Sequence, residues 1–266
     1  MQSNYSNSHK KYIAKQKMHH ITIISLRIFL AVAFIALWEI TTRTGLIDSF
    51  IFSSPGRMIK CFVKLSEDGM IYRHMWITIY ETLICFAIVI GVAFFTASLM
   101  WWCRGIFEVL EPFLVLLNSL PKSALAPVLI VWLGNDVKTI IVAAVSVAVF
   151  GAVLSMYTGF IETDTEKIKL IQTLGGTKKH ILFLLVIPSS LPVIINTMKV
   201  NLGLSLVGVI IGEFLAAKEG LGYLIIYGSQ VFKMDWVLLS IVILALLSIL
   251  LYLIIRLIEK KLVTSK

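Results

Sequence analysis

The hydrophobic residues of this chain gather into blocks near the length needed to cross a bilayer. Three blocks contain no charged residue over at least 20 positions: 83–102, 139–161 and 236–255. About 20 consecutive apolar residues span a hydrocarbon core of about 30 Å, so we predict a transmembrane helix for each block. A fourth block, 21–41, carries Arg27 and Glu39 near its ends, where long side chains reach the membrane surface. We predict that it is the first span.

Two further apolar blocks are interrupted, and the interruptions are informative. Residues 112–134 include Pro121, Lys122 and Pro127, and residues 190–212 include Pro192, Asn196, Lys199 and Asn201. A proline inside a helix frees a backbone carbonyl, which in lipid must be satisfied by a neighbouring helix or by water in a cavity. Both segments therefore belong inside the bundle or along a pathway, and they bring the expected number of spans to about six.

The composition is also that of a membrane protein. The 266 residues are 58% hydrophobic and 15% charged, with a mean hydropathy of +0.92, whereas soluble domains carry about 25% charged residues. We predict an all-α membrane protein in one bundle. Its expected parts are a cytoplasmic N-terminal segment over 1–20, a transmembrane domain over 21–258 and a cytoplasmic tail over 259–266. The first apolar block is similar to a signal peptide, but no small-residue cleavage pattern follows, so we interpret it as an uncleaved span.

The net charge is +9, and the lysines and arginines lie beside the apolar blocks. They do not form a basic stripe with interleaved aromatic residues. This distribution argues against a nucleic-acid partner and is typical of a topology signal. With both termini in the cytoplasm, the inside segments hold 14 lysines and arginines and the outside segments hold eight, so we predict this orientation. Five of the eight fall in the first outside segment: Arg43, Arg57, Lys60, Lys64 and Arg73. Its 57–73 portion is predicted to be an amphipathic helix at the lipid surface.

The longest predicted cytoplasmic loop, about 162–188, has the pattern of two short helices. Ile168, Ile171 and Leu174 share a face at helical spacing. Gly175 and Gly176 are expected to end that helix, and Thr177 is expected to cap the start of the next. Two short helices at a turn form a compact knob that projects from the bundle. From the residues alone, the knob fits an ordinary loop helix on the bilayer surface equally well.

The run Leu174-Gly175-Gly176-Thr177, followed by Ile187-Pro188, resembles the cytoplasmic "EAA" loop of permeases in binding-protein-dependent ABC importers. The resemblance implies that the loop docks in a groove of a separate ATPase subunit and transmits its closure. Where the family shows Glu-Ala-Ala, this chain has Lys169-Leu170-Ile171, and Glu166 is a displaced substitute for the glutamate. The residues implied for this coupling role are Glu166, Lys169, Leu174, Gly175, Gly176, Thr177 and Pro188.

Other segments are similar to the nitrate, sulfonate and taurine branch of that family, and the resemblance covers roughly residues 30 to 260. They are Trp38-Glu39, Ser54-Pro55, His74-Met75-Trp76, Pro121 to Pro127 with Trp132-Leu133-Gly134, and Gly212-Glu213-Phe214 with Glu219 to Ile225. The resemblance implies a type I permease bundle, a second permease copy, two ATPase subunits and an extracytoplasmic solute-binding protein. It implies a nitrate, sulfonate or taurine type of solute, with a thiamine-precursor pyrimidine or a flavin as the alternative. Glu219, Gly220 and Gly222 would form the external turn that closes the pathway, or else a flexible loop.

The chain lacks the phosphate cradle that a self-powered pump would need. The Gly-x4-Gly-Lys-Ser/Thr pattern is absent from the sequence. We therefore expect ATP and Mg²⁺ to be used by the partner ATPase and expect no cofactor on this chain. The histidines form no i, i+4 pair on a span, so no metal site is expected either.

Polar residues inside spans are costly and mark a pathway or a buried pair. Asn196, Lys199 and Gly203 fall on one helical face at i, i+3 and i+7, where an ammonium would favour an anion. Lys199 alternatively pairs with Glu213 or Glu81, or reaches the cytoplasmic surface. Asn118 fits a helix–helix contact as well as a pathway position. The pathway candidates are Asn118, Pro121, Asn196, Lys199, Gly203 and Glu213.

Two rival classes are disfavoured by what the spans lack. An ion-coupled secondary transporter usually has inverted repeats with paired broken helices and a coupling carboxylate, and no acidic residue lies at the middle of a predicted span. A membrane enzyme would need a nucleophile with a base, or a metal set. The sequence therefore favours a multi-pass permease of the cell membrane that performs no covalent chemistry.

Overall fold

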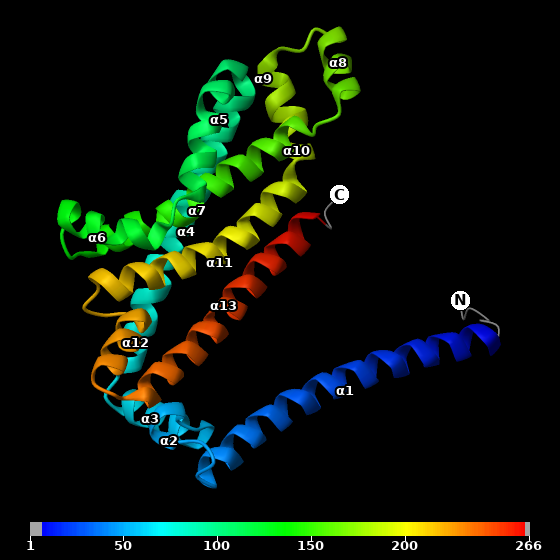
Figure 1. Cartoon of the computed structure of the whole chain (residues 1–266). Coiled ribbons are helices and arrows are strands. Elements are labelled where there is room, and N and C mark those ends of the chain that lie inside the picture. Colours follow the sequence, from blue (N-terminus) through cyan, green and yellow to red (C-terminus); the bar gives the residue numbers. More distant parts are fainter. Residues whose placement is uncertain (1–6, 264–266) are drawn as a thin grey trace. The chain divides into compact units, whose positions relative to one another are not determined.

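The computed structural model describes residues 7–263, and these form helices joined by short connections, with no strand among them (Figure 1). The predicted all-α class is therefore confirmed. Within residues 7–263, five helices are long and apolar enough to cross a membrane. They are α1 (Asn7–Arg43, with the span over its Lys15–Arg43 part), α4 (Met70–Trp102), α7 (Val137–Ile161), α11 (Leu191–Ala216) and α13 (Met234–Val263).

The chain divides into two compact units, the first ending at Val63 and the second beginning at Lys64. The first unit holds α1, the short α2 (Ser49–Phe52) and most of α3 (Pro55–Glu67). The carboxylate of Glu39 links these helices because it accepts hydrogen bonds from Arg43 Nε at 2.6 Å and from the backbone N–H of Gly56 at 2.9 Å. The end of α1 is thereby fixed to the start of α3.

In the second unit, α4 and α11 pack on α7 through small residues. A Cβ added to Gly208 would lie 2.8 Å from Cα of Ala144, and one added to Gly212 would lie 2.9 Å from Cα of Ile140. Only glycine permits so close an approach of α11 to α7. Such small-residue contacts are the usual way in which helices associate in lipid, where burial of apolar surface adds little. Ala97 of α4, another small residue, is fully buried.

The helices α4 and α7 run in the same direction. Near their ends, the rings of Phe94 and Phe160 make an edge-to-face contact with centroids 6.0 Å apart. Near their starts, Glu81 and Ile140 line one cavity. The connection between two parallel helices has to return across the thickness of the bundle, so residues 103–136 make that crossing.

The crossing is made by two short helices, α5 (Arg104–Ser119) and α6 (Lys122–Leu133), where we expected one interrupted span over 112–134. This is why five helices and not six have the length of a full span. The helix breaks at Pro121, and the ammonium of Lys122 donates to the carbonyls of Leu117 at 2.6 Å and Asn118 at 2.5 Å. The lysine thus satisfies backbone acceptors that the proline leaves without a partner.

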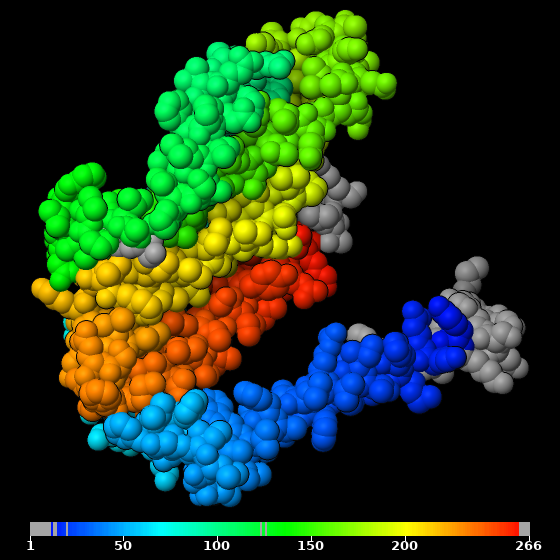
Figure 2. Space-filling view, viewed as in Figure 1, coloured from blue at the N-terminus to red at the C-terminus, as the bar shows by residue number. Residues whose placement is uncertain are grey.

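Helix α11 is antiparallel to α4 and α7. The connection before α11 therefore lies at the end of α7, and the connection after α11 lies near the starts of α4 and α7. At one end, α7 is followed by α8 (Thr165–Thr173), α9 (Lys178–Ile181), a π-helical turn (Leu182–Val186) and α10 (Ile187–Ser189). At the other end, α11 is followed by a turn and α12 (Leu221–Gln230). In Figure 2 the yellow-green atoms of α8 and α9 stand out at their end of the unit.

Candidate functional site

The loop at residues 162–188, called the coupling loop below after the role that its sequence resemblance implies, begins with a well-capped helix. The side chain of Asp164 accepts a hydrogen bond of 2.9 Å from the backbone N–H of Glu166 at the start of α8. At the other end of α8, Gly175 has a φ of 80°, Gly176 N–H donates to the Ile171 carbonyl at 2.8 Å, and Gly175 N–H donates to Gln172. This pair of bonds is a Schellman motif. The expectation that Gly175 and Gly176 end the first helix is confirmed.

The second part of the coupling loop also starts where the sequence predicts. Thr177 precedes α9, and its backbone N–H donates to Nδ1 of His180 at 3.1 Å. The backbone then widens into a π-turn, in which Ile187 N–H donates to the Leu182 carbonyl five residues back. Pro188 follows at once, and because proline has no N–H to continue the α-helical ladder, the widened turn redistributes the backbone bonds before it.

The coupling loop presents leucines to the outside. Ile168 and Ile171 are partly buried against the core of the bundle. Leu174, expected on the same face, is 78% exposed instead, because it lies beyond the last turn of α8. Leu170 is 59% exposed, and the side chains of Glu166 and Lys169 are exposed beside it. The loop therefore offers an apolar surface of two leucines bordered by charges.

Both ends of the coupling loop are tied to the helices that carry it. The hydroxyls of Thr163 and Ser189 lie 3.3 Å apart across the base of the loop. Ser190 Oγ donates to the carbonyl of Gly159, in the last turn of α7, at 2.8 Å. The loop is thus joined at its base to the end of α7 and to the residue before α11.

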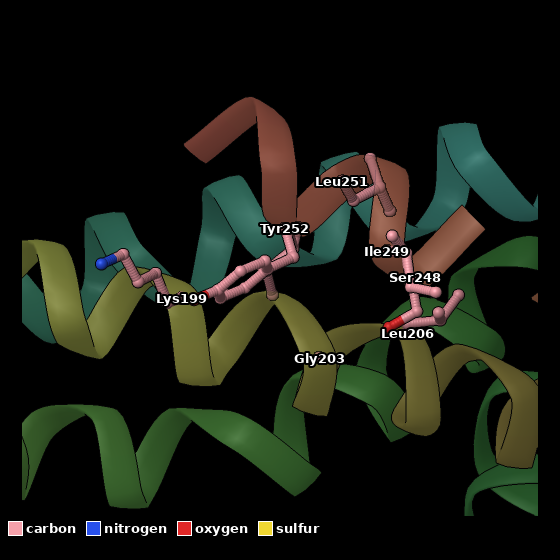
Figure 3. A pocket seen from close by; sticks show the side chains of 8 residues that line it. Lys199, Gly203, Leu206, Ser248, Ile249, Leu251 and Tyr252 are labelled. Carbon is pink, nitrogen blue, oxygen red and sulfur yellow. The ribbon is translucent and has the colours of Figure 1, made fainter. Parts of the chain in front are cut away.

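Lys199 is paired, but with a partner that the sequence did not indicate. Its Nζ lies 2.6 Å from Oε2 of Glu259 on α13. Neither Glu213 nor Glu81 is the partner. Glu213 is near the other end of α11, and Glu81 of α4 lies close to Glu213. Figure 3 shows Lys199, Gly203 and Tyr252 around a cavity of about 250 Å³ between α11 and α13.

The structure does not bring the six pathway candidates into one cluster. Asn118 and Pro121 lie at the break between α5 and α6, where Oδ1 of Asn118 is 3.3 Å from a Cβ built on Gly151 of α7. Asn196 is exposed, one turn before Lys199 and two turns before Gly203 on α11. Glu213 is near the opposite end of that helix.

Glu213 is 1% exposed and organises the turn between α11 and α12. Its carboxylate accepts hydrogen bonds from Thr78 Oγ1 at 2.7 Å and from the backbone N–H of Gly222 at 2.5 Å. Thr78 Oγ1 in turn accepts from Leu221 N–H at 2.8 Å. Glu81 of α4, also 1% exposed, lies next to Glu213.

Further contacts fix the same turn, residues 217–222, to α4. His74 Nδ1 accepts a hydrogen bond of 2.8 Å from Gly220 N–H, and Arg73 forms an ion pair with Glu219. Gly220 has a φ of 115°, and a Cβ there would collide with the carboxylate of Glu213. Glu219, Gly220 and Gly222 are thus all held by contacts with buried or charged side chains. We call this arrangement the turn lock.

Sequence reasoning missed most of the turn lock. His74, Thr78 and Glu81 recur at helical spacing on one face of α4, and all three are buried. A buried polar stripe in the first turns of a span predicts polar partners elsewhere in the chain. That signal was present in the sequence, but it did not indicate a partner 135 residues away.

Comparisons with known proteins found one matching family model and several similar proteins. A family model described as "Binding-protein-dependent transport system inner membrane component" matches residues 89–264. The formylaminopyrimidine transport permease protein ThiX of Halalkalibacterium halodurans is 28% identical over 70% of this chain and 74% of its own length. The SsuC permease protein of Bacillus subtilis, whose name assigns it to aliphatic sulfonates, is 24% identical over 88% of this chain and 85% of its own length.

A solved structure has the same fold. The MetNI methionine ABC transporter, in an inward-facing conformation, contains a chain that superimposes with a TM-score of 0.62 at 17% sequence identity. The match covers 75% of this chain and 97% of that one.

Proposed function

The chain belongs to the family of inner membrane components of binding-protein-dependent transport systems, and from this premise we propose how it works as the permease subunit of an ABC importer. The ATPase is a separate polypeptide, present in two copies, that grips the coupling loop. A second copy of the permease completes the translocation route, and an extracytoplasmic protein delivers the solute. ATP hydrolysis and Mg²⁺ belong to the ATPase, and this chain binds neither.

The observation that carries the proposal is the shape of the coupling loop. Leu170 and Leu174 are large apolar side chains exposed at the end of a rigid, capped helix. Apolar anchors surrounded by charges are typical of the centre of a protein–protein interface. Because Ser190 ties the loop to α7, closure of two ATPase subunits would move α7 and α11 together.

The orientation in the membrane is also part of the proposal. The coupling loop lies in the cytoplasm, both termini lie on the same side, and the turn lock faces the exterior. The excess of lysine and arginine in the predicted inside segments supports this orientation. This orientation requires an even number of membrane crossings. Because α4 and α7 are parallel, α5 and α6 together must return the chain across the bundle, and this supplies the additional crossing.

For the solute, we propose a small anion of the nitrate, sulfonate or taurine type, with a thiamine-precursor pyrimidine or a flavin as the alternative. The similarity to an aliphatic-sulfonate permease supports the first, and the similarity to a formylaminopyrimidine permease supports the second. Lys199 offers an anion no net charge while it is paired with Glu259. Uptake assays with each solute class, using the complete importer, distinguish these choices.

The coupling role is tested by replacing Gly175 with valine. A β-branched residue is strained at a φ of 80°, so the end of α8 would be distorted. We expect normal membrane insertion but loss of ATP-dependent uptake. Gly69→Val is the matched control, because Gly69 has a φ of 69° and equally open surroundings. Unchanged uptake by Gly175→Val would contradict docking at this loop, and ion-driven uptake by the chain alone would support a secondary transporter.

A further inference from the structure

The basic residues of the first outside segment are the feature that the permease role leaves unexplained. Positive charge usually avoids the external side of a membrane protein. Three of the five residues are engaged within the chain, since Arg43 pairs with Glu39, Arg73 pairs with Glu219 and Arg57 donates to Ser49. Lys60 and Lys64 lie with Arg57 on α3.

The helix α3 has two different exposed faces. Arg57, Lys60 and Lys64 are spaced at i, i+3 and i+7, so they share one face. Ile59 and Val63 share another, and they are 66% and 50% exposed. The helix is therefore amphipathic, as is typical of a helix that lies in the plane of a membrane surface.

The position of α3 in the chain requires it to lie at that surface. It belongs to the connection between the span that ends at Arg43 and the span that begins at Met70. The preceding α2 also exposes apolar side chains, with Phe50 and Phe52 each 54% exposed. Such side chains fit the boundary between lipid headgroups and acyl chains.

A polar cavity of about 470 Å³ lies beside the start of α3. Arg43, Arg57 and Lys60 line it, together with the hydroxyl-bearing Ser49 and Ser54. Arg57 is held in place because its Nη1 donates to the Ser49 carbonyl at 2.9 Å.

The charge balance of this cavity favours an anion. Glu39 is the acidic residue of its lining, and its carboxylate already accepts from Arg43 and from Gly56 N–H. Among the residues that the structure describes, Lys60 and Lys64 have no carboxylate partner within ion-pair distance. Glu67 and Asp68 follow Lys64 in the chain but do not line the cavity.

We propose that α3 and this cavity bind the phosphate headgroup of an anionic phospholipid, with the acyl chains against Ile59 and Val63. Lys60 and Lys64 supply positive charge beside Arg57, and Ser49 supplies a hydroxyl donor. The site holds the external connection at the lipid surface and accounts for the reversed charge of this segment.

The test uses the full chain in nanodiscs that contain equal amounts of phosphatidylglycerol and phosphatidylcholine. Native mass spectrometry measures the ratio of the two lipids that stay bound. The wild type should retain phosphatidylglycerol in preference. Lys60→Gln with Lys64→Gln should lower that preference about 25-fold, since each lysine near an anionic surface contributes roughly fivefold. Lys60→Arg with Lys64→Arg should keep it.

Lys178→Gln with Lys179→Gln removes the same charge from the coupling loop and is the matched control. An unchanged lipid ratio in the α3 variant, or an equal loss in the control, would overturn the site. Inorganic phosphate added to the protein in neutral detergent separates a lipid from a free anion. Binding of inorganic phosphate that depends on Lys60 and Lys64 without lipid would reassign the cavity and overturn the lipid proposal.

Discussion

The coupling loop and the turn lock lie at opposite ends of α11, and they use glycine in opposite ways. Gly175 has a φ of 80° with nothing within 4 Å of an added Cβ, so its only requirement is conformational. Gly220 has a φ of 115° and lies against the Glu213 carboxylate, so it must also leave space. The first glycine shapes a surface, whereas the second one closes a packed interior.

The polar groups of the two regions differ in the same way. In the coupling loop, the leucines and charged side chains point outward, where a partner can reach them. In the turn lock, the donors around Glu213 are consumed within the chain. We infer that one end is built to be contacted by another protein and the other to resist rearrangement. The expected effects of mutation therefore differ between stability and partner binding.

The largest effect on stability is expected for Glu213→Gln. The amide keeps only one acceptor oxygen, so its NH2 would face either the N–H of Gly222 or the hydroxyl of Thr78, leaving that buried donor unsatisfied at a cost of about 3 kcal/mol. Thermal unfolding of the purified chain in detergent measures this loss. Glu81→Gln is the matched control, since its amide can donate to Glu213. Equal destabilisation by the two variants would argue against Glu213 as the organising acceptor.

The two glycines provide the next comparison. Gly220→Ala should cost about 2 kcal/mol, because the added methyl displaces the Glu213 carboxylate as well as straining the backbone. Gly175→Ala should cost about 1 kcal/mol, from the left-handed conformation alone. Gly45→Ala, with a φ of 75° in open surroundings, calibrates the conformational part. Equal stability losses for Gly220→Ala and Gly175→Ala would indicate that the turn is loosely held.

Leu174→Asp should separate binding from stability. The side chain is 78% exposed, so unfolding should change by less than about 0.5 kcal/mol. Affinity for the ATPase should fall about tenfold, because a leucine is lost from the proposed interface. Quantitative co-purification in mild detergent is the measurement. Leu46→Asp, at an 80% exposed position outside the coupling loop, should leave co-purification unchanged.

The smallest effect is expected at the ion pair between Lys199 and Glu259. Replacing Lys199 with methionine should cost about 1 kcal/mol or less, because Glu259 is partly exposed to water. The double variant with Glu259→Gln should recover the loss, as a thermal unfolding cycle would show. If the double variant has normal stability but greatly reduced uptake, Lys199 has a role in the translocation pathway beyond its ion pair.

Local patterns in the sequence predicted the features that depend on local physics. Charge-free blocks predicted the long helices, and Gly175 with Thr177 predicted the end of α8 and the start of α9. Pro121 predicted an irregular segment, but the length of the resulting break depends on Lys122 capping α5, which only the structure shows. Leu174 was misplaced because a helix end turns its side chain away from the helical face.

The partners across the fold could not be predicted in this way. Glu259 pairs with Lys199 from 60 residues away, and Gly220 N–H reaches His74 across 146 residues. Such pairs depend on how the helices pack, and a single sequence contains no record of that packing. The buried stripe of His74, Thr78 and Glu81 indicated that partners were needed, without identifying them.

The most direct test of the account is a photoreactive amino acid placed at Leu174, in membranes that also contain the ATPase. We expect a cross-link between position 174 and the ATPase subunit. The same residue placed at Phe232, which is 69% exposed near the other end of the bundle, should give no such product. A cross-link at position 232 and none at position 174 would contradict the claim that the ATPase subunit binds the coupling loop.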